Sequence, residues 1–365
     1  MKEIIQKIHQ SPFKIFYIYS GGGSKAASDI LAVEGASQTL LESYCPYSRE
    51  SLNSFINKIP EKYCSLETTL NLASAGFIKA LKTNKSIKRK NLISVSVTAS
   101  IKTSTSKKGE HRFFIVVQTY NSTKHIKCIF DKDKYSRDEE EEILSNYVIC
   151  EIAKSCGIKA NPYIEVKNIL KNEVKPKKPV IKLFNNKIDF FSNNKSVSEL
   201  IFPGSFNPLH SGHIKMKELA EKKTGLKASY EISIKNADKP PLTYYEIQKI
   251  TDQFSKNENW ILTRSAKFSD KSYIFKNSIF VIGVDTLERI FKVKFYKSEE
   301  DMNSKISRML ENNVNFLVFG RNINGNFISL EDLVIPNALK DRCTGFSEDI
   351  FREDISSTEI RLNDD

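Results

Sequence analysis

Gly204-Ser-Phe-Asn-Pro-Leu-His-Ser-Gly-His213 lies between an apolar triplet, Leu200-Ile-Phe202, and a helical pattern that we expect from His210 toward Lys223. Its glycines let the backbone approach a ligand closely, and a helix N-terminus offers unpaired N–H groups and partial positive charge. Two imidazoles, His210 and His213, lie one helical turn apart at the same point. The stretch therefore predicts a strand, a tight turn and a helix that together bind a polyphosphate chain.

Beyond this decapeptide, the chain from Ser196 onward alternates between strand and helix patterns. Gly225 is expected to end the first helix, and Thr243 with Glu246 forms a capping box that begins the second. We predict strands at Leu200–Phe202, Ser229–Ile234, Trp260–Thr263, Ile279–Val284 and Val314–Phe319. Such alternation is typical of a doubly wound, mostly parallel sheet, which binds ligands beyond the carboxyl ends of its strands. The decapeptide follows the first strand and Asp285 follows the fourth, so both are expected at that edge.

A second segment with phosphate-binding character, Asp354-Ile-Ser-Ser-Thr-Glu-Ile-Arg361, lies near the end of the chain. Ser356 and Glu359 have the spacing of a capping box, which places hydroxyl and N–H groups at another helix N-terminus, with Arg361 one turn further on. The alternative is an ordinary cap on a C-terminal helix. We favour phosphate binding, because two such helix starts together suit one nucleoside triphosphate.

The composition indicates a globular protein with two cores. The chain has 365 residues, 40% of them hydrophobic, and no apolar run approaches the roughly eighteen residues that span a membrane. The first ten residues lack the apolar core of a signal peptide. Six scattered cysteines without a C-x-x-C pair fit a reducing, cytoplasmic setting and argue against a zinc site. We interpret the net charge of +12 as a solvated lysine-rich surface rather than a nucleic-acid interface, because no aromatic interleaving accompanies it.

The domain organisation is predicted as an α/β domain over residues 1–165, a linker over 166–195 and the β/α-alternating domain over 196–365. Expected elements of the first domain are strands at Lys14–Tyr19, Leu92–Val97 and Arg112–Thr119 and a helix from Arg137 to Cys156 that stops at Gly157. The linker is inferred from Lys175-Pro-Lys-Lys-Pro179 and nearby Asn-Asn pairs. A short hairpin around Val180–Phe191 is the alternative there.

The two phosphate-binding segments closely resemble the signatures of the nucleotidylyltransferase superfamily, a GSFNPxHxGH-type motif after the first strand and an ISSTxIR motif near the end. Phe280-Val-Ile-Gly-Val-Asp-Thr-Leu287 and Asn236-Ala-Asp-Lys-Pro-Pro-Leu-Thr243 further resemble segments of the nicotinamide and nicotinate mononucleotide adenylyltransferases. These matches cover most of residues 196–365. The resemblance implies a Rossmann-like domain in which an acceptor phosphate attacks the α-phosphorus of ATP and pyrophosphate leaves, as in NAD biosynthesis.

The resemblance also implies roles for particular residues. His210 and His213 would stabilise the transition state, and Arg361 would grip the leaving pyrophosphate. The nucleotide-binding positions would be Gly204, Ser205, Phe206, Gly212, Gly283, Asp285, Ser356, Ser357 and Thr358. Asn236 and Lys239 would contact the acceptor. Ordinary interpretations stay open for Lys239 as a solvated loop charge, for Asp285 as a helix cap, and for Arg321, whose role as a ligand contact is less favoured.

The second substrate is less well defined than the reaction. Members of the superfamily use pyridine mononucleotides, phosphopantetheine, phosphocholine or glycerol phosphate as acceptors, and ATP or CTP as donors. The segments around Asn236 and Phe280 favour nicotinamide or nicotinate mononucleotide with ATP. Mg²⁺ is expected to bridge the triphosphate without a fixed protein site. We expect no membrane or nucleic-acid partner, and a homodimer is one candidate for the oligomeric state.

Residues 1–165 resemble the C-terminal domain of the competence-damage-inducible CinA proteins, which include nicotinamide mononucleotide deamidases. The similar segments are Gly21-Gly22-Gly23, Val33-Glu-Gly-Ala-Ser-Gln38, Pro46-Tyr47-Ser48 and Ser96-Val-Thr-Ala-Ser100. Tyr19 takes the place of that family's catalytic serine, and Leu52 takes the place of its lysine. Three functions therefore stay open: an adenylyltransferase, an amidohydrolase that uses Ser20 in the N-terminal half, and a nucleotide-binding protein without turnover. The two halves together resemble an uncharacterised two-domain family found in plants and elsewhere.

Overall fold

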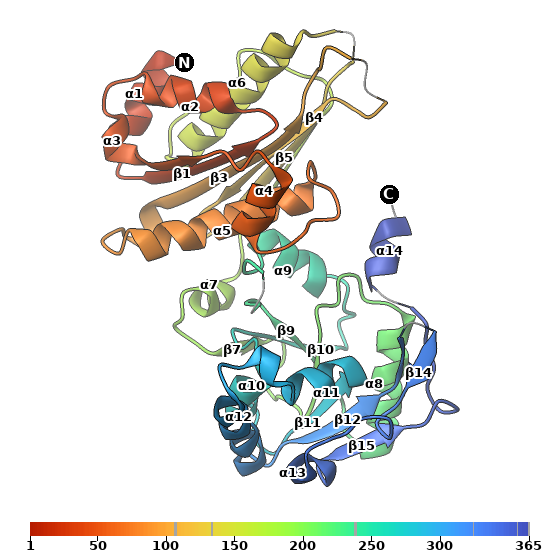
Figure 1. The fold of residues 1–365 in the computed structure, drawn as a ribbon. Helices are drawn as coiled ribbons and strands as arrows, with labels where there is room; N and C mark the ends of the chain where they lie inside the picture. The colour runs from red at the N-terminus through yellow and green to blue at the C-terminus, as the bar shows by residue number, and fades with distance from the viewer. Residues whose placement is uncertain (106–107, 133, 237–238, 324, 356, 364–365) are drawn as a thin grey trace. The chain divides into compact units, whose positions relative to one another are not determined.

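The computed structural model describes residues 1–365 apart from 106–107, 133, 237–238, 324, 356 and 364–365, and it leaves the side chains of 358, 362 and 363 undescribed. It divides into two compact units, each with its own sheet and helices (Figure 1). Unit 1 consists of Met1–Lys177 and Asp238–Gln248, and unit 2 of Lys178–Ala237 and Lys249–Asp365. Both are α/β, which confirms the predicted fold class.

Six strands form the sheet of unit 1 in the order β2-β1-β3-β4-β5-β6. Their bounds are β1 (Lys14–Ser20), β2 (Leu40–Tyr44), β3 (Leu92–Ser100), β4 (Arg112–Gln118), β5 (Thr123–Ile129) and β6 (Ile169–Val174). β1 pairs in parallel with β2 and β3, and the pairs from β3 to β6 are antiparallel. The predicted strands correspond to β1, β3 and β4, whose β-branched and aromatic runs are mostly buried.

Helices cover both faces of this sheet. They are α1 (Lys2–His9), α2 (Ser24–Leu31), α3 (Ala36–Thr39), α4 (Arg49–Ile56), α5 (Leu66–Thr83) and α6 (Arg137–Ser155). Apolar residues of α1, α2 and α6 share the main core with one face, and α5 packs Leu70 and Ala73 near Val116 on the other. The predicted acidic helix is α6, and Gly157 follows it at a φ of 78°, a conformation that favours glycine.

Residues 166–195 contain regular structure that the linker interpretation did not include. β6 pairs with β5 at one edge of the unit 1 sheet, α7 (Lys178–Phe184) follows, and β7 (Phe190–Ser192) pairs with β10 (Asn259–Thr263) in unit 2. Four of the six residues of β6 are exposed, as the edge of a sheet permits. The exposed Lys171, Asn172 and Glu173 of β6 and the following Lys-Pro run resemble a linker in composition, which explains the difference.

Seven strands form the sheet of unit 2 in the order β15-β12-β11-β8-β9-β10-β7. The bounds not yet given are β8 (Leu200–Pro203), β9 (Ser229–Ser233), β11 (Ile279–Gly283), β12 (Asn315–Phe319) and β15 (Cys343–Phe346). All pairs are parallel except that of β7 with β10. After the edge strand β7, the chain forms the central strand β8, moves outward through β9 and β10, and then returns to β11 on the other side of β8. This doubly wound order confirms the predicted sheet and places its topological switch point between β8 and β11.

The helices of unit 2 lie on both sides of its sheet (Figure 1). Besides α7, they include α8 (Ser211–Thr224), α10 (Phe268–Ile274), α11 (Val284–Ile290), α12 (Glu299–Glu311), α13 (Asn337–Lys340) and α14 (Ser357–Asn363). β13 (Arg321–Ile323) forms a small hairpin with β14 (Asn326–Ile328). Gly225 ends α8 at a φ of 73°, as predicted. Phe280, Ile282, Phe316 and Val318 form the centre of the core under α11 and α12.

The segment Asp238–Gln248 belongs to unit 1 although its neighbours in the sequence belong to unit 2. Within unit 1, the Ser74 hydroxyl donates to the Pro241 carbonyl over 2.5 Å, and the Tyr244 N–H donates to the Thr123 hydroxyl over 3.0 Å. The Tyr244 hydroxyl donates to the Tyr120 carbonyl over 2.7 Å. The predicted capping box is present, because the Thr243 N–H donates to the Glu246 carboxylate at the start of α9 (Tyr244–Thr251).

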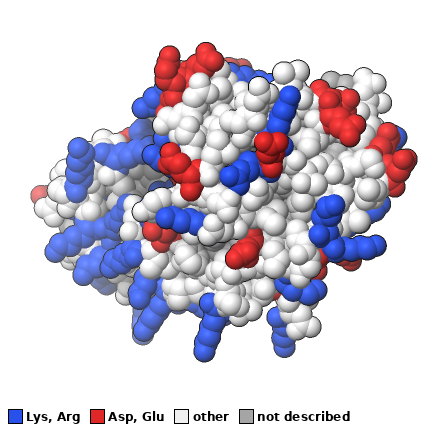
Figure 2. Space-filling model, turned by 90° about the horizontal axis from the view of Figure 1, so that it is seen from below, with Lys and Arg blue, Asp and Glu red and all other residues white. Residues whose placement is uncertain are grey.

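No helix in the described part of the chain is long and apolar enough to cross a lipid bilayer. On the face that Figure 2 shows, Lys and Arg side chains gather along one side, and Asp and Glu are scattered over the rest. With a net charge of +12, the protein attracts anionic ligands over a longer range than direct contact.

Candidate functional site

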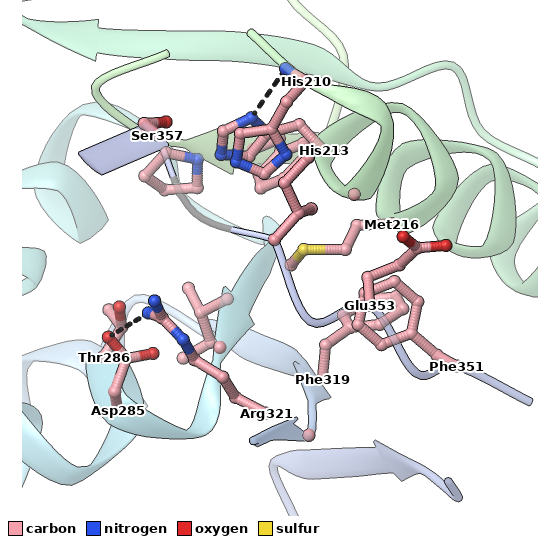
Figure 3. Close-up of a pocket in the computed structure, with 18 of the residues that line it drawn as sticks. His210, His213, Met216, Asp285, Thr286, Phe319, Arg321, Phe351, Glu353 and Ser357 are labelled. Atoms are coloured by element: carbon pink, nitrogen blue, oxygen red, sulfur yellow. Dashed lines mark hydrogen bonds and ion pairs between the residues drawn. The ribbon is translucent and has the colours of Figure 1, made fainter. Parts of the chain in front are cut away.

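A cavity of about 330 Å³ lies at the carboxyl ends of β8, β11 and β12 in unit 2 (Figure 3). The predicted site residues that line it are Gly204, Ser205, His210, Gly212, His213, Gly283, Asp285 and Ser357. The parallel sheet therefore brings the decapeptide, the end of the fourth predicted strand and the C-terminal motif to one edge. Met216, Thr286, Phe319, Phe351 and Glu353 also line the cavity and were not predicted as site residues, although Thr286 lies in the segment Phe280–Leu287 that carries part of the resemblance.

The turn after β8 is built on the ring of Phe206. The Phe206 side chain is fully buried, and the backbone φ of this residue is 43°. The centroid of its ring lies 5.1 Å from that of the His213 ring and 4.9 Å from that of the Tyr230 ring. A Cβ on Gly204 would come within 2.4 Å of the Phe206 ring, so only glycine fits there. Phe206 thus lies beneath the turn, outside the cavity lining, and supports the histidines from behind.

His210 and His213 form a stacked pair at the start of α8, with ring centroids 3.6 Å apart. The His210 backbone N–H donates to Nδ1 of His213 over 3.3 Å. Because Nδ1 of His213 accepts this bond, we infer that its neutral ring carries the proton on Nε2. Nδ1 of His210 is buried and has no hydrogen-bond partner among the described residues. The pair can therefore offer imidazole nitrogens to a ligand in the cavity.

Both imidazoles are neutral at pH 7. Burial, followed by the charges of His210 and Arg321, lowers the pKa of His213 to about 3. Burial and then Arg321 also lower the pKa of His210, while Glu353 acts in the opposite direction. A neutral imidazole donates a hydrogen bond without adding a charge to the cavity, and a bound anion would raise both pKa values.

The C-terminal motif is fastened to the decapeptide by hydrogen bonds. The Ser357 hydroxyl donates to the Pro208 carbonyl over 3.0 Å, and Nη1 of Arg361 donates to the Asn207 carbonyl over 2.5 Å. Ser357 lines the cavity, whereas Arg361 is not among the lining residues. The predicted contacts Ser356 and the side chain of Thr358 lie outside the described residues. Arg361 thus links the C-terminal motif to the decapeptide through its hydrogen bond to the Asn207 carbonyl.

Two glycines permit close contacts at the cavity wall. A Cβ on Gly212 would come within 3.2 Å of the His210 ring and of Ile355, and a Cβ on Gly283 would come within 2.7 Å of a carboxylate oxygen of Asp285. Asp285 lies in the first turn of α11, and its Oδ2 is 3.5 Å from Nη1 of Arg321. The acidic and basic side chains of this wall are therefore paired with each other.

The residues predicted for the acceptor lie elsewhere. Asn236 and Lys239 are exposed and do not line the cavity, and Lys239 belongs to the segment that is part of unit 1. No group of three or more His, Cys, Asp or Glu side chains in the described ranges is arranged to hold a metal ion.

The glycine turn of unit 1 is occupied by a side chain of the same unit. The Glu141 carboxylate accepts hydrogen bonds from the N–H groups of Gly23 and Lys25, both at 2.9 Å, and from the Ser24 hydroxyl at 3.1 Å. Tyr19 and Tyr47 line a cavity of about 260 Å³ beside it, and Ser20 is not among the lining residues. These three donors are therefore not available to an oxyanion in that cavity. This arrangement does not favour the amidohydrolase hypothesis.

Comparisons with known proteins match the two parts of the chain separately. Residues 201–363 match a protein family described as cytidylyltransferase-like. This chain is similar to the solved structure of a competence/damage-inducible protein from Agrobacterium tumefaciens, with 11% sequence identity, a TM-score of 0.32, and coverage of 43% of this chain and 91% of that chain. It is also similar to a competence or damage-inducible protein from Enterobacter asburiae, with 14% identity, a TM-score of 0.35, and coverage of 42% of this chain and 97% of that chain. A CinA superfamily protein from Escherichia coli is similar as well, with 10% identity, a TM-score of 0.32, and coverage of 42% of this chain and 84% of that chain. No curated protein matches.

Proposed function

We propose that this protein, whose residues 201–363 match the cytidylyltransferase-like family, is a nucleotidyltransferase that moves AMP from ATP to nicotinamide or nicotinate mononucleotide. The family match supports nucleotidyl transfer in general. The observation that carries the proposal is the stacked pair of neutral imidazoles at the start of α8, in a cavity that the C-terminal motif also lines. The pyridine nucleotide as acceptor is supported by the sequence segments around Asn236 and Phe280.

In the proposed reaction, an oxygen of the acceptor phosphate forms a bond to the α-phosphorus of ATP. The bond from that phosphorus to the bridging oxygen of the β-phosphate breaks, and pyrophosphate leaves with the electron pair. This transfer needs in-line positioning and stabilisation of negative charge, and it needs no nucleophile from the protein. His210 and His213 supply hydrogen-bond donors, and the first N–H groups of α8 supply others. Mg²⁺ would enter bound to the triphosphate, as part of the substrate.

A panel of donors and acceptors tests this proposal. Purified protein with Mg²⁺ is given ATP or CTP together with each pyridine mononucleotide, phosphopantetheine, phosphocholine or glycerol phosphate. We expect pyrophosphate release with ATP and a pyridine mononucleotide, and a dinucleotide product by mass spectrometry. Release with another acceptor only would reassign the second substrate. If the protein binds nucleotide but releases no pyrophosphate with any pair of donor and acceptor, the transfer reaction is contradicted and the protein is a nucleotide-binding protein without turnover.

Triphosphate binding is expected to draw protons onto the histidine pair. The free protein holds the pKa of His213 at about 3 and lowers that of His210. A bound polyanion favours the imidazolium form, so both pKa values rise on binding and the complex holds more protons than the free protein. The affinity for ATP should therefore increase as the pH falls from about 8 to about 6.

Calorimetry in buffers of different ionisation enthalpy measures this proton uptake directly. The His213→Gln variant is the comparison, because the protonation of the nucleotide itself then cancels. Equal uptake in the variant and the wild-type protein would show that His213 does not titrate on binding.

A further inference from the structure

Arg321 and Asp285 form one wall of the cavity, and neither belongs to the two phosphate-binding motifs. Arg321 begins β13 directly beyond β12, and Asp285 lies in the first turn of α11. Their side chains point toward each other in Figure 3, with Nη1 of Arg321 3.5 Å from Oδ2 of Asp285, and the two histidines lie together on another side. The cavity thus has a wall of neutral donors and a wall that carries a guanidinium.

A triphosphate in this cavity needs positive charge, and the lining offers little of it. Arg321 is the single Lys or Arg among the described residues that line the cavity. The two imidazoles are neutral in the free protein, and Arg361 donates to the Asn207 carbonyl. The charge of Arg321 lowers the pKa of both His210 and His213, which indicates that its guanidinium faces the same part of the cavity as the two rings.

We propose that Arg321 is the cationic contact of the bound triphosphate and that Asp285 is a positioning residue, which holds the guanidinium at the cavity until phosphate oxygens replace or share the carboxylate. This inference rests on the proposed nucleotide site. It gives Asp285 a different role from the ribose contact that the sequence resemblance implies.

The geometry of the pair suits an exchange of partners. At 3.5 Å the contact is longer than a strong ion-pair hydrogen bond, and both side chains are partly exposed, 47% for Arg321 and 37% for Asp285. Exposed ion pairs of this kind contribute little to stability, so opening the pair costs little free energy. A guanidinium can then form two parallel hydrogen bonds to phosphate oxygens, which an ammonium cannot.

Equilibrium binding of ATP and AMP to the full chain tests the role of Arg321. We expect Arg321→Gln to weaken ATP binding roughly tenfold to a hundredfold and to change AMP binding much less. Arg321→Lys, which keeps the charge but loses the planar fork, should fall between. Arg289→Gln, an exposed arginine at the end of the helix that carries Asp285, is the matched control and should bind both nucleotides as the wild-type protein does. An unchanged preference for ATP over AMP in Arg321→Gln would overturn the proposal.

Two further readouts separate positioning from other roles. Asp285→Asn should weaken ATP and 2′,3′-dideoxy-ATP binding by the same factor, whereas selective loss of the ribose preference would make Asp285 a ribose contact and overturn its positioning role. In an NMR titration, Arg321→Gln should raise the pKa of His213, which a purely structural role would not do. None of these measurements needs turnover. Altered binding with no pyrophosphate release would reject the transfer reaction alone, and unaltered binding with release would reject the role of Arg321 alone.

Discussion

The His210→Ala variant is expected to release pyrophosphate at least about a hundredfold more slowly than the wild-type protein. His210 is the N-cap residue of α8, its ring centroid lies 3.6 Å from that of His213, and its buried Nδ1 has no partner among the described residues. Its removal takes away a donor and also the ring that holds His213 in place. Because the lost contacts act most strongly on charge that develops in the transition state, kcat should fall more than KM rises. Steady-state rates with saturating ATP and acceptor measure the effect.

The controls for this variant lie on the same helix. Lys222→Ala changes an exposed residue in the last turn of α8 and should leave the rate unchanged. His210→Gln keeps a donor of similar reach and should recover part of the lost rate. A wild-type kcat in His210→Ala would show that His210 does not contribute to the reaction, even if the panel of acceptors shows transfer.

The Lys271→Met variant is expected to destabilise unit 2 by about 3–5 kcal/mol. Glu231 on β9 and Lys271 on α10 form a buried ion pair, and the Thr263 hydroxyl also donates to the Glu231 carboxylate. Removing the ammonium leaves a carboxylate that burial has separated from water. Trp260, the single tryptophan of the chain, lies on β10 of the same sheet. Its fluorescence during urea unfolding therefore reports on unit 2.

Two comparison variants show whether the pair itself is responsible. The double variant Glu231→Gln/Lys271→Met removes both charges and should recover part of the stability, since a pair of neutral side chains costs less to bury. Lys292→Ala breaks a partly exposed pair with Glu288 and should change the free energy of unfolding by less than about 1 kcal/mol. If Lys271→Met lowered the free energy of unfolding by less than about 1 kcal/mol as well, the buried Glu231–Lys271 pair would not have the stabilising role that we assign to it. Lys271→Met should also disturb the turn after β8, because the Gly204 N–H in that turn donates to the Glu231 carbonyl over 2.9 Å.

The doubly wound, mostly parallel sheet of unit 2 was predictable because its central strands are largely buried. Short apolar runs such as Leu200–Phe202 and Ile279–Val284 alternate with helical patterns, and that alternation leaves few other topologies. The same reasoning placed His210, His213 and Asp285 at one edge of the sheet. The motif residues Gly204 and Gly212 needed only local geometry, which sequence patterns describe well.

The partners of long side chains were not predictable in the same way. Nothing near Arg361 in the sequence indicates that its guanidinium reaches the Asn207 carbonyl, a contact that depends on how α14 returns to the start of the sheet. Glu353 lines the cavity and pairs with Lys215 for the same reason. The predicted acceptor residue Lys239 stands on a segment that packs within unit 1, and a strand or helix pattern carries no information about such long-range packing.

The discontinuity of unit 1 has a consequence for synthesis of the protein. The ribosome delivers Met1–Lys177 first, and Asp238–Gln248, which completes the unit, emerges only after β8, α8 and β9 have been made. Until then Ser74, Thr123 and the Tyr120 carbonyl lack the partners that Pro241 and Tyr244 provide. The N-terminal half therefore reaches its final packing only when the decapeptide and its helix already exist. Each unit is thus completed by a stretch of chain that is made after part of the other unit, and neither corresponds to one uninterrupted stretch of the sequence.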